Sequence, residues 1–124
     1  MELKFYVCEH CGNIVTKVED KGTPLMCCGT AMKEIVPGTV DAAVEKHVPA
    51  YEVADGVVKV SVGEVEHPMM EAHYIQWIAV ATNQGFQIKY LKPEEAPKAE
   101  FALAAGEEVD AVYAYCNLHG LWKK

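Results

Sequence analysis

The sequence lacks the features that mark membrane, nucleic-acid-binding and secreted proteins. No apolar run approaches the length needed to cross a bilayer. The 18 acidic residues outnumber the 11 basic ones, and the formal charge of −7 argues against a nucleic-acid partner, which needs a basic face. Nothing at the N-terminus resembles a signal peptide. We therefore expect a cytoplasmic protein with no membrane partner.

Helical periodicity, internal repeats and low-complexity tracts are also missing. From residue 40 onward, short apolar segments alternate with turn signals such as Asp55-Gly56 and Asn83-Gln84-Gly85. This spacing is typical of an antiparallel β-sandwich with about seven strands. The strands are expected at residues 40–44, 51–54, 57–62, 74–82, 86–91, 99–103 and 109–116.

Residues 1–36 contain few large apolar residues and form a segment too small for a hydrophobic core to hold alone. Four of the five cysteines lie here, as Cys8-x2-Cys11-Gly12 and Cys27-Cys28-Gly29, which is metal-ligand spacing. The adjacent pair should distort a tetrahedral site. Four thiolates select zinc or iron, and the spacing does not separate the two. Two disulfides are the alternative, which the apparently intracellular cysteine usage disfavours.

The chain therefore divides into a metal-stabilised domain at 1–36, a linker at 37–39 marked by Pro37-Gly38, and a β domain at 40–124. The β domain has a second set of potential ligands, which combines one soft thiolate with four imidazoles and suits a redox metal. Five donors exceed the four of a structural zinc site, so a small molecule could occupy a further position. The five residues are His47, His67, His73, Cys116 and His119.

On the expected strand layout these five residues fall at the ends of β segments, where loops converge. A single histidine is more often a structural residue, but the set shares one domain with the only unpaired cysteine. Lys46, beside His47, would give local positive charge for an anion. We assign His10, inside the first cysteine knuckle, to neither site and expect it to face solvent.

Five motifs carry a resemblance that covers essentially the whole chain. They are the two cysteine pairs, Glu45-Lys46-His47-Val48-Pro49, His67-Pro68-Met69, His73-Tyr74-Ile75-x-Trp77-Ile78 and Cys116-Asn117-Leu118-His119-Gly120. In type and order they resemble the motifs of the desulfoferrodoxin family, the two-iron class of superoxide reductase. Five motifs in the right order are far more specific than any one of them.

The resemblance implies a mainly β protein with a desulforedoxin-like N-terminal domain and an immunoglobulin-like sandwich. It implies a first iron held by Cys8, Cys11, Cys27 and Cys28. It implies a second iron with His47, His67, His73 and His119 as equatorial ligands, Cys116 as the axial thiolate and an open sixth position. The implied reaction reduces superoxide by one electron to hydrogen peroxide, without releasing dioxygen.

The resemblance also implies roles for neighbouring residues. Lys46 would attract the anion and orient a water or proton, and Glu45 would occupy the open position after the product leaves. Asn117 and Gly120 would shape the cysteine loop, and backbone N–H groups near Leu118 would hydrogen-bond the thiolate sulfur. The implied partners are a rubredoxin-like electron donor and a second copy of the chain.

Two other classes of function remain open at this point. A copper electron carrier also places cysteine and histidine on the loop after a strand, but it uses two histidines and usually a methionine after the cysteine. No methionine follows Met70. A zinc-stabilised binding module would explain the four N-terminal cysteines and leave the histidine set unexplained.

Overall fold

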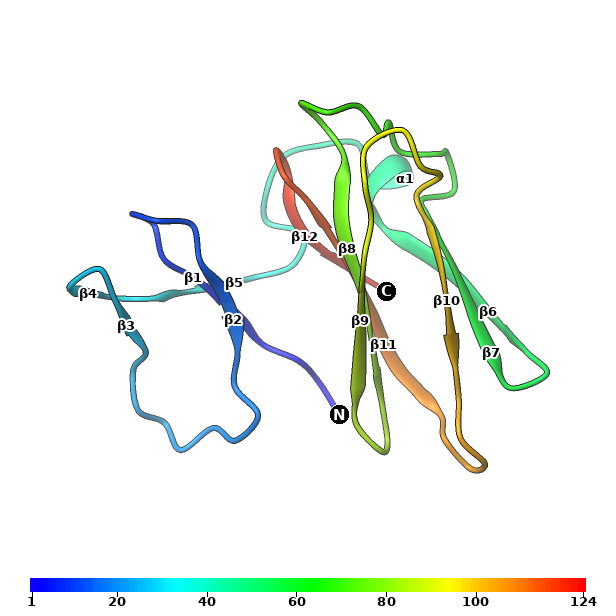
Figure 1. The fold of residues 1–124 in the computed structure, drawn as a ribbon, viewed down its shortest axis with the longest axis horizontal. Coiled ribbons are helices and arrows are strands. Elements are labelled where there is room, and N and C mark those ends of the chain that lie inside the picture. The colour runs from blue at the N-terminus through cyan, green and yellow to red at the C-terminus, as the bar shows by residue number, and fades with distance from the viewer. The chain divides into compact units, whose positions relative to one another are not determined.

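The computed structural model describes all 124 residues and divides them into two units. One unit is Leu3–Val36, and the other consists of Met1–Glu2 with Pro37–Lys124. Figure 1 shows β1 to β5 in the first unit and α1 to β12 in the second. No helix in the structure is long and apolar enough to span a bilayer.

The small unit contains only short strands. Three of them form an antiparallel sheet in the order β2-β1-β5, and the other two form a separate hairpin. Its buried apolar side chains are Leu3, Phe5 and Cys8, which is too few for a core that could stabilise it alone. The strands are β1 Phe5–Val7, β2 Ile14–Thr16, β3 Met26–Cys27, β4 Thr30–Ala31 and β5 Lys33–Ile35.

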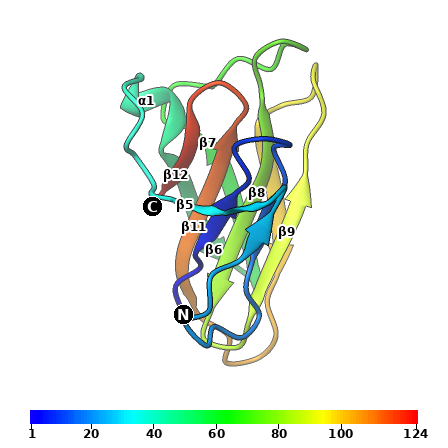
Figure 2. The ribbon, with the colours of Figure 1, turned by 90° about the vertical axis from the view of Figure 1, so that its left-hand side faces the viewer.

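The larger unit is a sandwich of two antiparallel sheets, ordered β10-β7-β6 and β12-β11-β8-β9 (Figures 1 and 2). This confirms the expected mainly β class. Its elements are α1 Val44–His47, β6 Pro49–Ala54, β7 Val57–Val62, β8 Ile75–Thr82, β9 Phe86–Tyr90, β10 Lys98–Ala102, β11 Val109–Cys116 and β12 Gly120–Lys123.

The core of the sandwich follows from the two-residue period of its strands. In β7, Val58, Val60 and Val62 are buried, while Lys59 between them is exposed. The valines pack in one cluster with apolar side chains of β8, β10 and β11, including Phe101. Each buried valine stabilises the fold by about 1.5–3 kcal/mol. This core gives the loops at the ends of the strands a rigid support.

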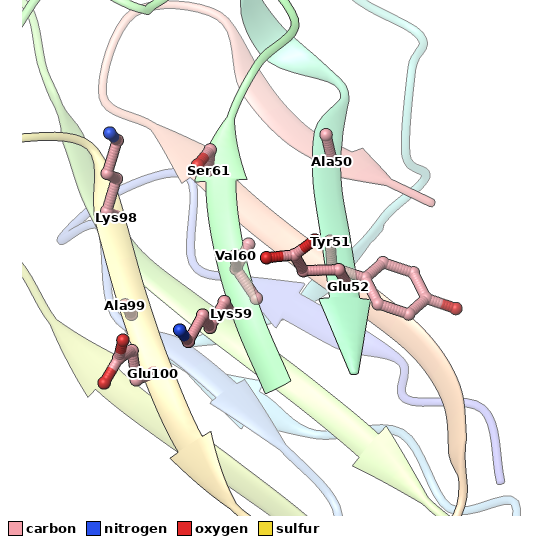
Figure 3. A pocket seen from close by; sticks show the side chains of 9 residues that line it. All are labelled: Ala50, Tyr51, Glu52, Lys59, Val60, Ser61, Lys98, Ala99 and Glu100. Atoms are coloured by element: carbon pink, nitrogen blue, oxygen red, sulfur yellow. The ribbon is translucent and has the colours of Figure 1, made fainter. Parts of the chain in front are cut away.

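The outer face of the β10-β7-β6 sheet is polar. Lys59 stands opposite Glu52 of β6 and Glu100 of β10 in the strand register, so one cation lies between two carboxylates. Figure 3 shows these side chains along a shallow cavity of about 400 Å³. None of the predicted metal ligands lines this cavity.

The prediction of a strand at residues 40–44 is wrong. Val40 and Val44 are exposed, and the segment instead leads into the single turn of α1. Val48 adopts an extended conformation because it precedes Pro49, which disfavours the helical region for its neighbour. The apolar alternation of 40–44 thus finds no strand to pair with, and the short helix presents His47 instead.

Candidate metal centres

The four N-terminal sulfur atoms converge on one point, with all four Sγ atoms within 4.8 Å of one another. The backbone N–H of Gly12 donates to the Cys8 carbonyl (2.9 Å), which closes the first knuckle, and Gly12 has a φ of +82°. The backbone N–H of Cys11 points at the Cys8 Sγ (3.5 Å). All four thiols are free, so the structure has no disulfide in this unit.

The adjacent cysteines share a site because of the turn between β3 and β4. Cys28 and Gly29 are the two central residues of this hairpin and have positive φ values of 51° and 77°. Two positive φ values are the mark of a type I′ turn, which matches the twist of the flanking strands. Side chains of consecutive strand residues point to opposite faces. The left-handed conformation of Cys28 instead brings its sulfur to the same side as that of Cys27.

The pKa values of the Cys8 and Cys28 thiols differ widely. The backbone N–H of Cys11 lowers the pKa of the Cys8 thiol to about 6, whereas hydrogen bonding with the Cys11 side chain raises the pKa of Cys28 to about 12. A metal ion must displace the remaining protons, because the thiolate is the ligand. Binding of the metal is therefore coupled both to pH and to the folding of this small unit.

The second set of donors lies at one end of the sandwich, on five separate segments. His47 ends α1, His67 follows β7, His73 precedes β8, Cys116 ends β11, and His119 lies in the turn between β11 and β12. Donor atoms of His47, His67, His73 and Cys116 lie within 4.8 Å of one another. The Nδ1 of His119 lies 3.2 Å from the His47 Nε2 and 3.9 Å from the Cys116 Sγ.

The four imidazoles form a closed ring in the order 47, 67, 73, 119. Neighbouring ring centroids are 4.6, 4.7, 5.0 and 5.0 Å apart, and neighbouring planes cross at 79° to 86°. His47 and His73, on opposite sides, are 6.4 Å apart with planes only 28° from parallel. Imidazoles that surround a common point in this way could together serve as ligands of one metal ion. The ring does not fit the two-histidine set of a copper electron carrier.

Backbone carbonyls fix two of the imidazoles from outside the ring. The Nδ1 of His47 lies 2.7 Å from the Ala43 oxygen, and the Nδ1 of His67 lies 2.6 Å from the Pro68 oxygen. An Nδ1–H that donates to a carbonyl leaves the Nε2 lone pair free for a metal. Trp122 contacts the His47 ring at 5.0 Å and donates its indole N–H to the His119 carbonyl (2.9 Å).

Burial favours the neutral form of three of these histidines, His47, His67 and His73. Burial lowers the pKa of His47 and His73, and it lowers the pKa of His67 to about 4. Neutral imidazole is the form that binds a metal. The Nε2 of His73 is buried and has no hydrogen-bond partner. Such an atom normally carries a desolvation cost of about 1–3 kcal/mol, which a metal bond would remove.

Cys116 is fully buried, and burial raises the pKa of its thiol, while the backbone N–H groups of Leu118 and His119 act in the opposite direction. A metal ion would shift that balance to the thiolate. Four imidazoles and one sulfur supply five donors, so the residues fit a redox iron with one coordination position left for a small molecule. His10 is exposed and belongs to neither group.

Lys46 and Glu45 lie on α1 directly before His47, and both are exposed. Their backbone is nevertheless anchored, because the N–H of Val65 donates to the Glu45 carbonyl (2.9 Å). A Cβ on Gly63 would lie 2.6 Å from the same oxygen, so only glycine allows this close approach. The anchored backbone leaves both charged side chains directed to solvent beside the histidine ring.

Sequence reasoning missed the supporting contacts that four residues make to the ligands or to the backbone beside them: Ala43, Gly63, Pro68 and Trp122. Ala43 and Pro68 act through their carbonyl oxygens, which every residue carries, so no side-chain pattern could reveal them. Gly63 and Trp122 lie close to ligands in the sequence. That proximity was the one available signal.

Comparison with known proteins matches both units. The desulfoferrodoxin family model covers residues 39–124, and the model of the desulfoferrodoxin N-terminal domain covers residues 1–35. The chain is 47% identical over 122 residues to a desulfoferrodoxin of Nitratidesulfovibrio vulgaris, covering 98% of this chain and 95% of the relative. It is similar to the crystal structure of the superoxide reductase of Treponema pallidum, with 40% identity and a TM-score of 0.84 over 100% of this chain and 99% of the other.

Similarity also extends to a smaller protein that matches only part of the chain. The one-iron superoxide reductase of Giardia intestinalis is 33% identical, with a TM-score of 0.55 over 64% of this chain and 95% of its own. Nearly the whole of that protein is thus matched by about two thirds of this one.

Proposed function

The chain belongs to the desulfoferrodoxin family, and on that premise we propose that it is a superoxide reductase acting at the histidine and cysteine centre of the sandwich. Superoxide, one electron and two protons give hydrogen peroxide, and no dioxygen is released. The observation that carries the proposal is the closed ring of four imidazoles with a buried thiol beside it. When iron is bound there, it supplies the single electron.

The ligands are His47, His67, His73, His119 and Cys116, and each has a support in the fold. Burial favours the neutral form of His47, His67 and His73, and carbonyl oxygens orient His47 and His67. The thiolate contributes electron density, and the neighbouring N–H groups moderate that contribution. These residues hold the metal and tune its potential, while Lys46 and Glu45 act on the substrate side.

Lys46 attracts superoxide to a protein whose net charge of −7 otherwise repels anions. Its exposure and its place beside His47 support this role, and it also positions a water or proton for the product. Glu45 would supply a carboxylate to the metal once peroxide has left. Its carbonyl is fixed by Val65 and its side chain is exposed, so the carboxylate can move without moving the backbone.

The small unit would hold the first iron through Cys8, Cys11, Cys27 and Cys28, and that iron would store or relay an electron. We assign the domains to residues 1–36 and 40–124, joined by 37–39. A rubredoxin-like protein is the proposed donor, and a homodimer is the proposed assembly, which could form through β6 and β9, each at an edge of its sheet. Five free thiols support a reducing compartment such as the cytoplasm.

The function is tested by stepwise oxidation of the iron-loaded protein, followed by absorption spectroscopy and by measurement of peroxide and dioxygen. We expect two irons per chain and a tetrathiolate spectrum that appears first. Superoxide added to the half-reduced protein should produce a second, longer-wavelength thiolate band, with one peroxide per superoxide and no dioxygen. One iron per chain, or release of dioxygen, would contradict the proposal.

A further inference from the structure

The side chain of Asn117 bridges both residues that flank His73. Its Oδ1 accepts a hydrogen bond from the Tyr74 N–H (3.0 Å), and its Nδ2 donates to the Ala72 carbonyl (3.0 Å). Its own backbone N–H donates to the Tyr74 carbonyl (3.3 Å). The two side-chain hydrogen bonds therefore fix the peptide groups on either side of His73, and the backbone hydrogen bond fixes the next peptide group along the chain.

His73 differs from His47 and His67 in how its ring is oriented. Carbonyl oxygens lie beside the Nδ1 atoms of His47 and His67, whereas the Nε2 of His73 is buried without a hydrogen-bond partner. Its backbone is held by a reciprocal pair of hydrogen bonds with Met70, at 2.9 and 3.0 Å. The direction of the His73 imidazole thus depends on the backbone of residues 72–74, and Asn117 is the side chain that bonds this backbone.

Asn117 acts at the point where regular pairing of β8 with β11 stops. Tyr115 pairs with Trp77, and then the register shifts so that Cys116 pairs with Ile75. Beyond this irregularity, the amide of Asn117 replaces the next ladder hydrogen bonds. It is also the residue directly after Cys116 and lies two residues before His119.

We propose that Asn117 is a positioning residue that sets the His73 imidazole relative to the Cys116 thiolate, through the backbone of residues 72–74. It touches neither the metal nor the substrate. Hydrogen bonding by the side chain couples two ligands that are far apart in the sequence, so their geometry is set together. The inference rests on the proposed iron centre but not on its reactivity with superoxide.

The test compares Asn117→Ala with Asn83→Ala in the iron-loaded protein. Asn83 is a matched control at the opposite end of β8, because its Nδ2 donates to the Gly106 carbonyl (3.2 Å) and its Oδ1 accepts from the Glu108 N–H (2.9 Å). The readouts are the position of the thiolate absorption band, the reduction potential of the second centre and the rate of iron loss to a chelator.

We expect Asn117→Ala to shift the band and the potential and to weaken iron binding by about 10- to 100-fold, as loss of an outer support does at other metal sites. Asn83→Ala should lower thermal stability and leave all three readouts unchanged. Asn117→Asp keeps the acceptor for Tyr74 and loses the donor to Ala72, so it should shift the readouts less and in the same direction.

A double-mutant cycle separates positioning from general loss of stability. In a His73→Ala background, Asn117→Ala should shift the band no further, because the ligand through which it acts is gone. An equal shift of the band in the wild-type and His73→Ala backgrounds would overturn the proposal. If Asn117→Ala does not fold, Asn117→Asp takes its place in the test. A wild-type band and potential in Asn117→Asp would then overturn the proposal. If the wild-type protein binds two irons and yet does not reduce superoxide, that result would contradict the proposed superoxide reductase activity, but the test of Asn117 would still apply.

Discussion

The thiolate centre and the histidine and cysteine centre are built over different lengths of chain. All four sulfurs of the first lie within residues 8–28, on two turns, and Cys11 and Cys28 are exposed. The five donors of the second come from residues 47–119, and His47, His67 and Cys116 are buried. A site built from local turns can have little core around it, whereas a site built from distant loops needs a folded core first.

Because their cores differ in size, the small unit depends on its metal for stability, whereas the sandwich folds without one. The small unit buries only three apolar side chains, whereas the sandwich has a continuous core across both sheets. The free energy that holds the first unit must therefore come from metal binding. The second unit presents its ring of imidazoles on a scaffold that hydrophobic burial already stabilises.

Removal of both metals should have the largest effect, because it should unfold the small unit and leave the sandwich folded. A structural tetrathiolate metal contributes about 10 kcal/mol to a small domain, so we expect β1 to β5 to unfold and β7, β8 and β11 to stay folded. Amide hydrogen exchange of the chelated protein measures this directly. Simultaneous loss of protection in both units would contradict the comparison, and readdition of iron should restore protection in residues 3–36.

Single cysteine variants should remove one centre at a time. Cys28→Ser should abolish the tetrathiolate spectrum and leave the rate of superoxide reduction within about twofold, because the second centre is built without this unit. Cys116→Ser should leave the tetrathiolate spectrum unchanged and abolish superoxide reduction. Absorption spectra and rates of the two variants provide the measurement. Loss of the second band in Cys28→Ser would show that the centres are not independent.

Acid should destabilise the metal-free sandwich through its histidines. The pKa of His67 is about 4 in the folded protein and near 6.5 when unfolded, so the unfolded state binds the proton first as pH falls. His67 has no such effect above pH 6.5, and stability should fall by about 2–3 kcal/mol between pH 6.5 and pH 4. Urea unfolding monitored through the sandwich measures this loss. His67→Gln should show a shallower pH dependence, and an unchanged slope would exclude His67 as its source.

Loss of Lys46 should have the smallest effect, because it leaves every predicted metal ligand in place and acts mainly on the approach of the anion. We expect Lys46→Ala to lower the second-order rate with superoxide by about 5- to 10-fold and to flatten its dependence on ionic strength. Lys59→Ala is the matched control, since it removes the same charge from the outer face of β7 (Figure 3). Equal effects of the two variants would mean that only net charge matters.

The sequence predicted the parts of the fold that depend on residue type and period. The alternation of Val58, Val60 and Val62 with polar neighbours predicted β7, and the structure confirms it. The same reasoning was wrong for residues 40–44, whose apolar residues have the spacing of a strand but find no partner strand. It also missed β12, which has only four residues and begins at Gly120. Pairing partners are a property of the whole fold and are absent from a local pattern.

What the sequence alone determined was the chemistry of the donors. Cysteine and histidine are soft or borderline ligands wherever they lie, so their types and spacing indicated one tetrathiolate group and one larger set for a redox metal. Only the tertiary structure decided which nitrogen faces inward and in what order the imidazoles surround the centre. Those properties depend on carbonyl contacts and on the bonds of Asn117, which join residues about 45 positions apart. Such contacts exist only once the core has brought the strand ends together.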